Sequence, residues 1–107
     1  MSYPIASTLL DAVVLSVLEH KDLYGYRITQ GVRQNLDVSE STLYPVLRRL
    51  QKNGCLATYD RSSDGRNRRY YSITGLGRAM LRQYRLDWVE YRQQIEYLLF
   101  PEGGSQQ

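Results

Sequence analysis

Residues 39–74 decide the fold and read SESTLYPVLRRLQKNGCLATYDRSSDGRNRRYYSIT. In the first part of this stretch, apolar residues recur at the spacing of one helical face: Leu43, Val46, Leu47 and Leu50. Gly54 follows as a natural helix stop, because glycine readily adopts the left-handed conformation. Two β-type runs come next, at 55–59 and 69–73, on either side of a polar loop that contains a glycine. The pattern predicts a helix and then a hairpin with a long, flexible tip.

The start of this helix has two candidate positions. With Ser39 as the N-cap, Pro45 falls in the second turn, where it removes the hydrogen bond to the carbonyl of Ser41 and loosens the helix. With Thr42 as the N-cap, Pro45 falls in the first turn and costs little. The residues alone favour the later start.

Two further helices are predicted before this stretch. Residues 8–21 have one apolar face: Leu10, Val13, Val14, Val17 and Leu18. After a turn at 22–25, the apolar face of a second short helix consists of Ile28 and Val32, with either Tyr24 or Leu36. The predicted elements along the chain therefore begin with three short helices and a hairpin.

A long helix completes the predicted fold. Thr74 is a suitable cap for a helix from Gly75 to about Leu99, where Phe100 and Pro101 end it. The expected fold class is mainly α with a small β-hairpin (α+β), a winged helix-turn-helix with a long C-terminal dimerisation helix. Residues 1–74 would form the winged helix-turn-helix DNA-binding domain, and residues 75–107 the dimerisation helix and tail, within one compact unit.

The charge of the chain is concentrated in one segment. The 107 residues carry a net charge of +3, but residues 48–69 hold seven basic and two acidic side chains, a local net charge of +5. The rest of the chain therefore carries −2. A basic segment of this kind suits a polyanionic partner, although a solvated basic face without a partner has the same composition.

Several functional classes find no support in the composition. His20 is the only histidine and Cys55 the only cysteine, so we expect no disulfide within the chain, no metal site and no cofactor. A small buried hydrophobe is the expected role of Cys55. Phosphate-binding glycine loops and paired carboxylates are missing, which argues against an enzyme. Without a signal peptide or a membrane-spanning apolar segment, the expected location is the cytoplasm, with no membrane partner.

The face of the 39–52 helix opposite its apolar residues has the chemistry of a DNA-reading surface. It carries Ser41, Pro45, Arg48 and Lys52, flanked by Thr42, Tyr44 and Arg49. Hydroxyl groups near a helix start can reach bases or phosphates, and Arg48 can make a bidentate contact to guanine. Arginines of the hairpin could reach a neighbouring groove or the backbone. A solvent-exposed amphipathic helix would show the same inner face.

Several motifs together resemble the PadR-type transcriptional regulators over about residues 9–99. They are Tyr24-Gly25-Tyr26, STLYPVLRRL at 41–50, Asn53-Gly54, Gly65-Arg66, RRYYSIT at 68–74 and Gly77. In that family the STLYP segment belongs to the recognition helix, so the resemblance implies a start near Ser39, and we adopt it. Gln51 and Glu40 depart from the family pattern. Glu40 would repel phosphate unless it acts at the helix start.

The residue chemistry and the resemblance together give a candidate DNA-binding set. It consists of Tyr24, Ser39, Ser41, Thr42, Tyr44, Arg48, Arg49, Lys52, Gly65, Arg66, Arg68 and Arg69. The predicted partner is double-stranded DNA.

The last helix carries a heptad pattern. Apolar and aromatic residues recur at alternating spacings of three and four: Leu81, Tyr84, Trp88, Tyr91, Ile95 and Leu98. A helix of this length extends roughly 37 Å, longer than so small a domain can cover. We therefore expect these residues to form a homodimer interface, with the 8–21 helix of the partner chain as the simplest counterpart. The alternative is that the stripe packs only on its own domain.

The single C-terminal helix resembles the smaller PadR subfamily. Its members are dimeric repressors, and some bind planar aromatic compounds in a pore at the dimer centre. The resemblance therefore implies a ligand site at Trp88, Tyr84, Tyr91 and Arg92, with two indoles stacking a flat ligand. A purely structural interface tryptophan is the alternative. The neighbouring arginines favour an anionic or neutral aromatic compound.

Two functional hypotheses follow. The first is a dimeric PadR-like repressor that binds a pseudo-palindromic DNA operator and is released by a planar aromatic ligand. The second is a dimeric winged-helix interaction module that binds protein or RNA without sensing a small molecule. Preference for one duplex over random DNA, and its dependence on salt, distinguishes the two.

Overall fold

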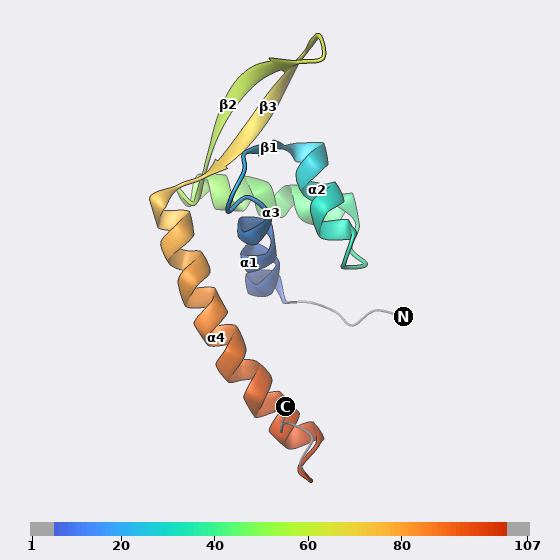
Figure 1. Cartoon of the computed structure of the whole chain (residues 1–107), viewed down its shortest axis with the longest axis vertical. Coiled ribbons are helices and arrows are strands. Elements are labelled where there is room, and N and C mark those ends of the chain that lie inside the picture. Colours follow the sequence, from blue (N-terminus) through green and yellow to red (C-terminus); the bar gives the residue numbers. More distant parts are fainter. Residues whose placement is uncertain (1–5, 103–107) are drawn as a thin grey trace.

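The computed structural model describes residues 6–102, and this part of the chain contains four helices and a three-stranded antiparallel sheet (Figure 1). The elements in chain order are α1 (Ser7–Val17), β1 (Leu23–Tyr24), α2 (Gly25–Arg33), α3 (Glu40–Lys52), β2 (Leu56–Ser63), β3 (Arg66–Ile73) and α4 (Gly75–Leu99). The predicted winged helix-turn-helix with a long C-terminal helix is confirmed. Residues 1–5 and the end of the predicted tail, 103–107, lie outside the described residues.

The core lies between α1, α2 and α3, and the base of the hairpin closes it. Its buried members are Leu10, Val14, Leu15, Leu18, Ile28, Val32, Leu43, Val46, Leu47, Leu50, Cys55, Leu56, Ile73 and Leu81. The predicted inner face of α3 is therefore confirmed. In α1 the prediction was incomplete: Leu15 is fully buried, whereas Val13 and Val17 are only partly buried. The reason is that α1 packs against α2, α3 and α4 and so buries more than one face.

The helix α3 begins at Glu40, with Ser39 as its N-cap. The Ser39 hydroxyl accepts a hydrogen bond of 3.2 Å from the Thr42 backbone N–H, which satisfies one of the free donors of the first turn. The earlier start is therefore correct, and the preference from the residues alone for Thr42 was wrong. Pro45 lies inside the helix but on its exposed face, where Ser41, whose carbonyl loses its helical partner, is also exposed.

The hairpin β2–β3, called the wing below, differs from the prediction. Its strands pair from Leu56↔Ile73 to Ser63↔Arg66, and only Asp64 and Gly65 connect them. The predicted long, flexible tip is wrong. Asp64 and Gly65 have φ of 54° and 76°, the positive values that a tight two-residue hairpin turn requires and that Asp-Gly readily adopts. Polar side chains do not prevent this pairing, because the ladder is made by the backbone.

A two-residue strand, β1, also joins the sheet, where the sequence predicted only a turn. It pairs with β3 through Leu23↔Tyr71 and Tyr24↔Tyr70, giving the strand order β1-β3-β2. Such a short strand has no room for an alternating pattern. Its consequence is that the start of α2 lies against the wing.

The helix α4 is anchored to the domain only over its first part. The Thr74 hydroxyl caps it by accepting a bond of 3.0 Å from the Gly77 N–H, and it donates one of 2.6 Å to the Gly54 carbonyl. Leu81 lies in the core, but the second half extends beyond the domain and gives the molecule a long axis of 57 Å (Figure 1). None of the helices in residues 6–102 is long and apolar enough to cross a membrane.

Candidate nucleic-acid interface

Hydroxyl and cationic groups share the outward face of α3. Ser41, Thr42, Arg48 and Lys52 are all exposed. At the helix start, the Ser39 hydroxyl lies 2.9 Å from the hydroxyls of both Ser41 and Thr42. This arrangement presents small polar groups near the N-terminus of the helix and positive charge farther along it, as a helix that enters a groove of DNA requires.

A hollow of about 590 Å³ lies between the start of α2, α3 and the wing. It is lined by Tyr24, Gly25, Tyr26, Tyr44, Arg66, Arg68, Arg69 and Tyr71. Five of the predicted DNA-binding residues therefore meet in one place: Tyr24, Tyr44, Arg66, Arg68 and Arg69. The hollow combines cations with phenol hydroxyls, both of which can donate hydrogen bonds to phosphate.

The prediction missed Gly25, Tyr26 and Tyr71 as lining residues of this hollow. Tyr71 could have been found from strand periodicity, because it lies two residues after Arg69 and therefore on the same face of β3. For Tyr26 the signal was its place in the Tyr-Gly-Tyr motif. The missing information was that β1 pairs with β3 and brings this motif to the wing.

Aromatic rings position the arginines of the wing. The Arg68 guanidinium carbon lies 4.3 Å from the centroid of the Tyr24 ring, and that of Arg61 lies 5.1 Å from the Tyr70 ring. Tyr70 in turn packs edge-to-face against Tyr24 and stacks on Tyr59. Cation–π contacts at exposed sites contribute about 0.5–1 kcal/mol each. They favour defined orientations of these cations before any partner binds.

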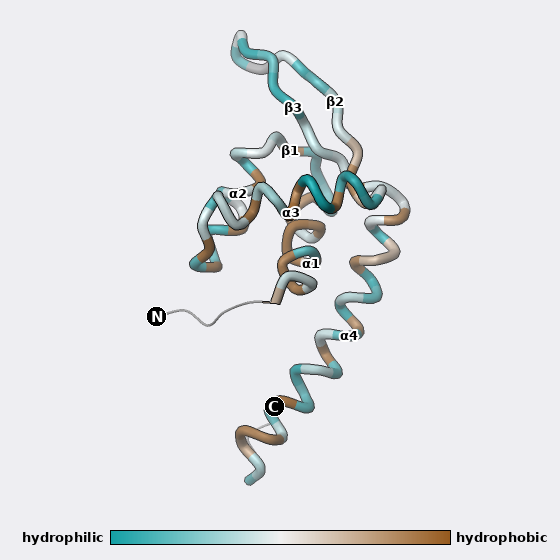
Figure 2. Tube along the Cα trace, turned by 180° about the vertical axis from the view of Figure 1, so that it is seen from behind, coloured by the Kyte–Doolittle hydropathy of each residue, from teal (hydrophilic) through white to brown (hydrophobic). Residues whose placement is uncertain are grey.

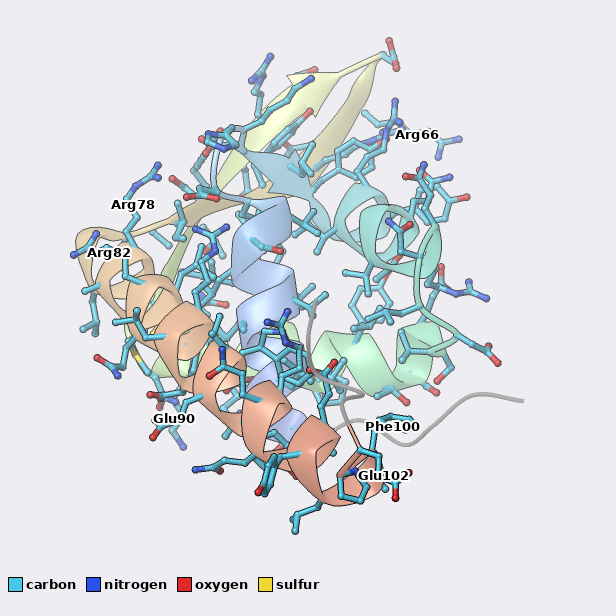
Figure 3. The ribbon with its side chains drawn as sticks, turned by 60° about the horizontal axis from the view of Figure 1, so that its bottom comes forward. Arg66, Arg78, Arg82, Glu90, Phe100 and Glu102 are labelled. Atoms are coloured by element: carbon cyan, nitrogen blue, oxygen red, sulfur yellow. The ribbon has the colours of Figure 1, made fainter. Side chains whose placement is uncertain are left out.

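The remaining cations of the wing are less constrained. Arg69 lies 3.9 Å from Asp60 across the ladder, and both side chains are largely exposed, so the pair is weak. Arg66 follows the turn directly and is exposed (Figure 3). Gly65 supplies the turn itself. The wing therefore carries its cations in its outer half, from the Asp60↔Arg69 pair to the tip.

Arg49 makes an ion pair within the protein, whereas its neighbour Arg48 is exposed. The Arg49 guanidinium forms an ion pair with the carboxylate of Asp11 on α1, and only 8% of Asp11 is exposed. The structure thus places Arg49 on the side of α3 that faces α1.

Glu40, the acidic departure from the family pattern, is the first residue of α3. Its carboxylate accepts a long hydrogen bond of 3.5 Å from the Thr29 hydroxyl.

A second hollow, of about 320 Å³, lies between α1 and α4. It is lined by Ala6, Thr8, Leu9, Ala12, Tyr84, Asp87, Trp88 and Tyr91. Three predicted ligand-binding residues thus come together, whereas Arg92 is not part of the lining. The rings of Trp88 and Tyr91 have centroids 6.5 Å apart. Burial, and next the negative charge of Asp11, raises the pKa of the Tyr84 phenol.

The predicted dimer residues are covered mainly at the start of α4. Leu81 is buried and Tyr84 is half-buried, whereas Trp88 is 41% exposed, Tyr91 57% and Leu98 73%. Ile95 is again half-buried. Beyond Tyr84 most of the stripe is exposed apolar surface, and hydrophobic segments recur along α4 outside the domain (Figure 2).

The cysteine has the expected structural role. Cys55 is fully buried, its sulfur lies 3.3 Å from that of Met80, and burial raises the pKa of its thiol. A thiol with a raised pKa is a poor nucleophile, because the thiolate is the reactive form. Within residues 6–102, no group of three or more His, Cys, Asp or Glu side chains is placed to hold a metal ion.

Comparison with known proteins gives a consistent result. Residues 14–83 match the model of the transcriptional regulator PadR-like family. The chain is 39% identical over 88 residues to the transcriptional regulator Rv3488 of Mycobacterium tuberculosis, covering 78% of this chain and 82% of that protein. The crystal structure of smu.1704 from Streptococcus mutans has a TM-score of 0.84 and 35% identity, covering 92% of this chain and 93% of that one.

A structure solved with DNA shares the fold. The crystal structure of Bacillus subtilis PadR in complex with operator DNA has a TM-score of 0.63 and 23% identity, and it covers 71% of this chain and 46% of that one. At this identity the similarity is one of fold alone.

Proposed function

Because the chain belongs to the PadR-like family of transcriptional regulators, we propose that it is a dimeric repressor that binds a pseudo-palindromic operator and is released by a planar aromatic ligand. Proteins of this family are DNA-binding regulators and not enzymes. In this proposal residues 1–74 bind DNA, and residues 75–107 provide the dimerisation helix and tail.

The observation that carries the DNA-binding proposal is the hollow between α2, α3 and the wing. Elements that are distant in the sequence contribute cations and phenols to this one surface. The outward face of α3 would enter the major groove, with Arg48 reading a base edge. Arg66, Arg68 and Arg69 of the wing would contact phosphates on the adjacent backbone.

The exposed part of α4 supports the dimer. A lone chain leaves Trp88, Tyr91 and Leu98 in water, and a second copy would cover them with its own α4 and α1. Two-fold symmetry would also place two copies of α3 to read two half-sites about 34 Å apart, one turn of DNA.

The hollow between α1 and α4 supports the ligand proposal. It is small and lined mainly by apolar and aromatic groups, which suits a flat aromatic compound. In a dimer whose two α4 helices adjoin, Trp88 of each chain would lie near the other, and Arg92 would flank the site.

Selection from a random-sequence duplex library, followed by fluorescence anisotropy at several salt concentrations, tests DNA binding. We expect the selected duplex to bind about 10³-fold or more tightly than random DNA, with affinity falling steeply as salt rises. Equal affinity for all duplexes, or none, contradicts the proposal. It would instead favour an interaction module that binds protein or RNA.

Variants at two arginines separate base reading from phosphate contact. Arg48→Ala should lower affinity mainly for the selected duplex, by about 1–3 kcal/mol, and relax specificity at one base position. Arg68→Ala should weaken all sequences alike. Arg82→Ala is the matched control, because it removes the same charge from an exposed site on α4, remote from the wing (Figure 3). Equal losses on selected and random DNA for Arg48→Ala would refute its assigned role.

The dimer and the ligand are tested separately from DNA. Sedimentation velocity at micromolar concentration should give a dimer, and a folded monomer contradicts that part of the proposal. Trp88 is the only tryptophan, so its fluorescence reports on the hollow directly. Titration with a panel of planar aromatic sulfonates should give saturable quenching, and its absence removes the ligand from the proposal.

A further inference from the structure

Asp11 is the one charged residue among the buried side chains of the described chain. It lies on α1, between the core leucines, and its side chain is only 11% exposed. An isolated buried carboxylate is costly, so such a group persists only when it is paired. Its partner is Arg49, whose guanidinium comes from α3.

The ion pair joins two helices: Asp11 belongs to α1 and Arg49 to α3. The half-buried Tyr84 of α4 packs against the same core. All buried polar side-chain atoms in the described part of the chain have a partner. The pair is therefore a satisfied polar contact between α1 and the recognition helix.

Packing of Leu43, Val46, Leu47 and Leu50 sets which face of α3 points into the core, and it leaves only small rotations of the helix open. Successive residues of a helix are separated by about 100° around its axis. Arg48 lies on the exposed side of α3, and a directional ion pair holds its neighbour Arg49 against α1. The pair thus restricts the small rotations of α3 about its own axis that apolar packing leaves open.

We infer that Asp11 is a positioning residue for DNA recognition: through Arg49 it fixes the rotation of α3 so that its hydroxyl and arginine groups meet the bases in one register. The inference rests on the proposed DNA binding and adds a residue on α1, outside the DNA-facing surface. Phosphate contacts by the wing tolerate small rotations of α3, whereas base contacts do not. Loss of the pair should therefore cost specificity before it costs general affinity.

The test compares affinity for two duplexes by fluorescence anisotropy. One is the duplex that the wild-type protein selects from a random library, and the other is a scrambled duplex of equal length and composition. Asp11→Asn should weaken binding of the selected duplex about tenfold and change binding of the scrambled one less than about twofold. The ratio of the two affinities therefore falls about tenfold. Partial unfolding would lower both affinities equally and leave the ratio unchanged.

Further variants make the test decisive. Arg49→Lys keeps the cation, so its ratio of affinities for the selected and the scrambled duplex should stay close to that of the wild type. The double variant Asp11→Asn/Arg49→Gln leaves no unpaired buried charge, so it should fold. Its affinity ratio should fall as far as that of Asp11→Asn alone. Glu19→Gln is the matched control, because it breaks an ion pair to Arg85 on α4 and leaves α3 untouched.

The outcomes distinguish the inference from the proposed function. If the wild-type protein selects no duplex, the proposed function fails and the inference fails with it. If it selects one but the ratio is unchanged in Asp11→Asn or in the double variant, the inference alone is wrong. An equal fall of the ratio in Glu19→Gln would also overturn it.

Discussion

Gly77 lies in the first turn of α4, directly against the carbonyl of Cys55. A Cβ atom at this position would fall far inside van der Waals contact of that oxygen and 2.9 Å from Cγ1 of Ile73. The carbonyl cannot easily withdraw, because it accepts a hydrogen bond of 3.1 Å from the Thr74 N–H. Gly77→Ala therefore forces α4 and the base of the wing apart.

Two opposing effects set the size of the expected change. Alanine in a helix is favoured over glycine by about 1 kcal/mol. Overpacking at a well-packed site costs typically about 1–3 kcal/mol, and a clash with backbone belongs at the upper end of that range. We expect Gly77→Ala to lower the free energy of unfolding by about 2 kcal/mol in total. For a domain of this size, that lowers Tm by roughly 8–16 °C.

Urea denaturation followed by circular dichroism measures this change. The matched control is Gly75→Ala, two residues earlier in the same helix, where no atom lies within 4 Å of a built Cβ. That variant should be as stable as the wild type or more stable by up to about 1 kcal/mol. If Gly77→Ala is at least as stable as the wild type, or if both variants lose the same amount, the packing argument is refuted.

The remaining predictions concern the turn, the cap and an ion pair. Gly65→Ala should cost about 1 kcal/mol in urea denaturation, because φ is 76° at this position. Ser39→Ala should also cost about 1 kcal/mol, since the Thr42 N–H loses its side-chain acceptor; Ser39→Asp, which retains an acceptor, should not. The bond from Arg85 holds the pKa of Glu19 below its ordinary value, so this pair stabilises the fold at neutral pH and the stabilisation is lost as pH falls through the lowered pKa. Glu19→Gln should therefore be less stable than the wild type at pH 7, and this difference should shrink as pH is lowered into the acid range; a difference that grows at acid pH would contradict the assignment.

Most of the fold could be predicted because its helices have clear apolar faces and caps. Thr74 and Gly54 mark their helix ends as expected. The start of α3 could not be decided from propensity, because the cost of Pro45 depends on whether its face is exposed. The length of the paired strands in the wing was underestimated because these strands are polar. The Asp64-Gly65 pair, whose φ values are positive, is itself typical of a two-residue hairpin turn.

The candidate site was predictable in its residue types but not in its internal pairings. Arg48 and Arg49 are adjacent in the sequence and chemically identical, yet one is exposed and the other is paired with Asp11. That partner lies 38 residues away, and no local pattern reveals it. The same holds for Tyr24, whose contact with Arg68 depends on the pairing of a two-residue strand.

The tight turn of the wing lowers the conformational-entropy cost of binding any partner at the wing. The flexible nine-residue loop predicted from the sequence would have to become ordered when a partner binds. This would cost about 1–2 kcal/mol of backbone conformational entropy for each ordered residue. Here the ladder continues to Ser63 and Arg66, so most of that penalty is met during folding. Arg66, and Arg61 and Arg68 further along the ladder, are therefore held on a rigid hairpin before any partner binds. Less of their electrostatic attraction is then offset by ordering of the loop.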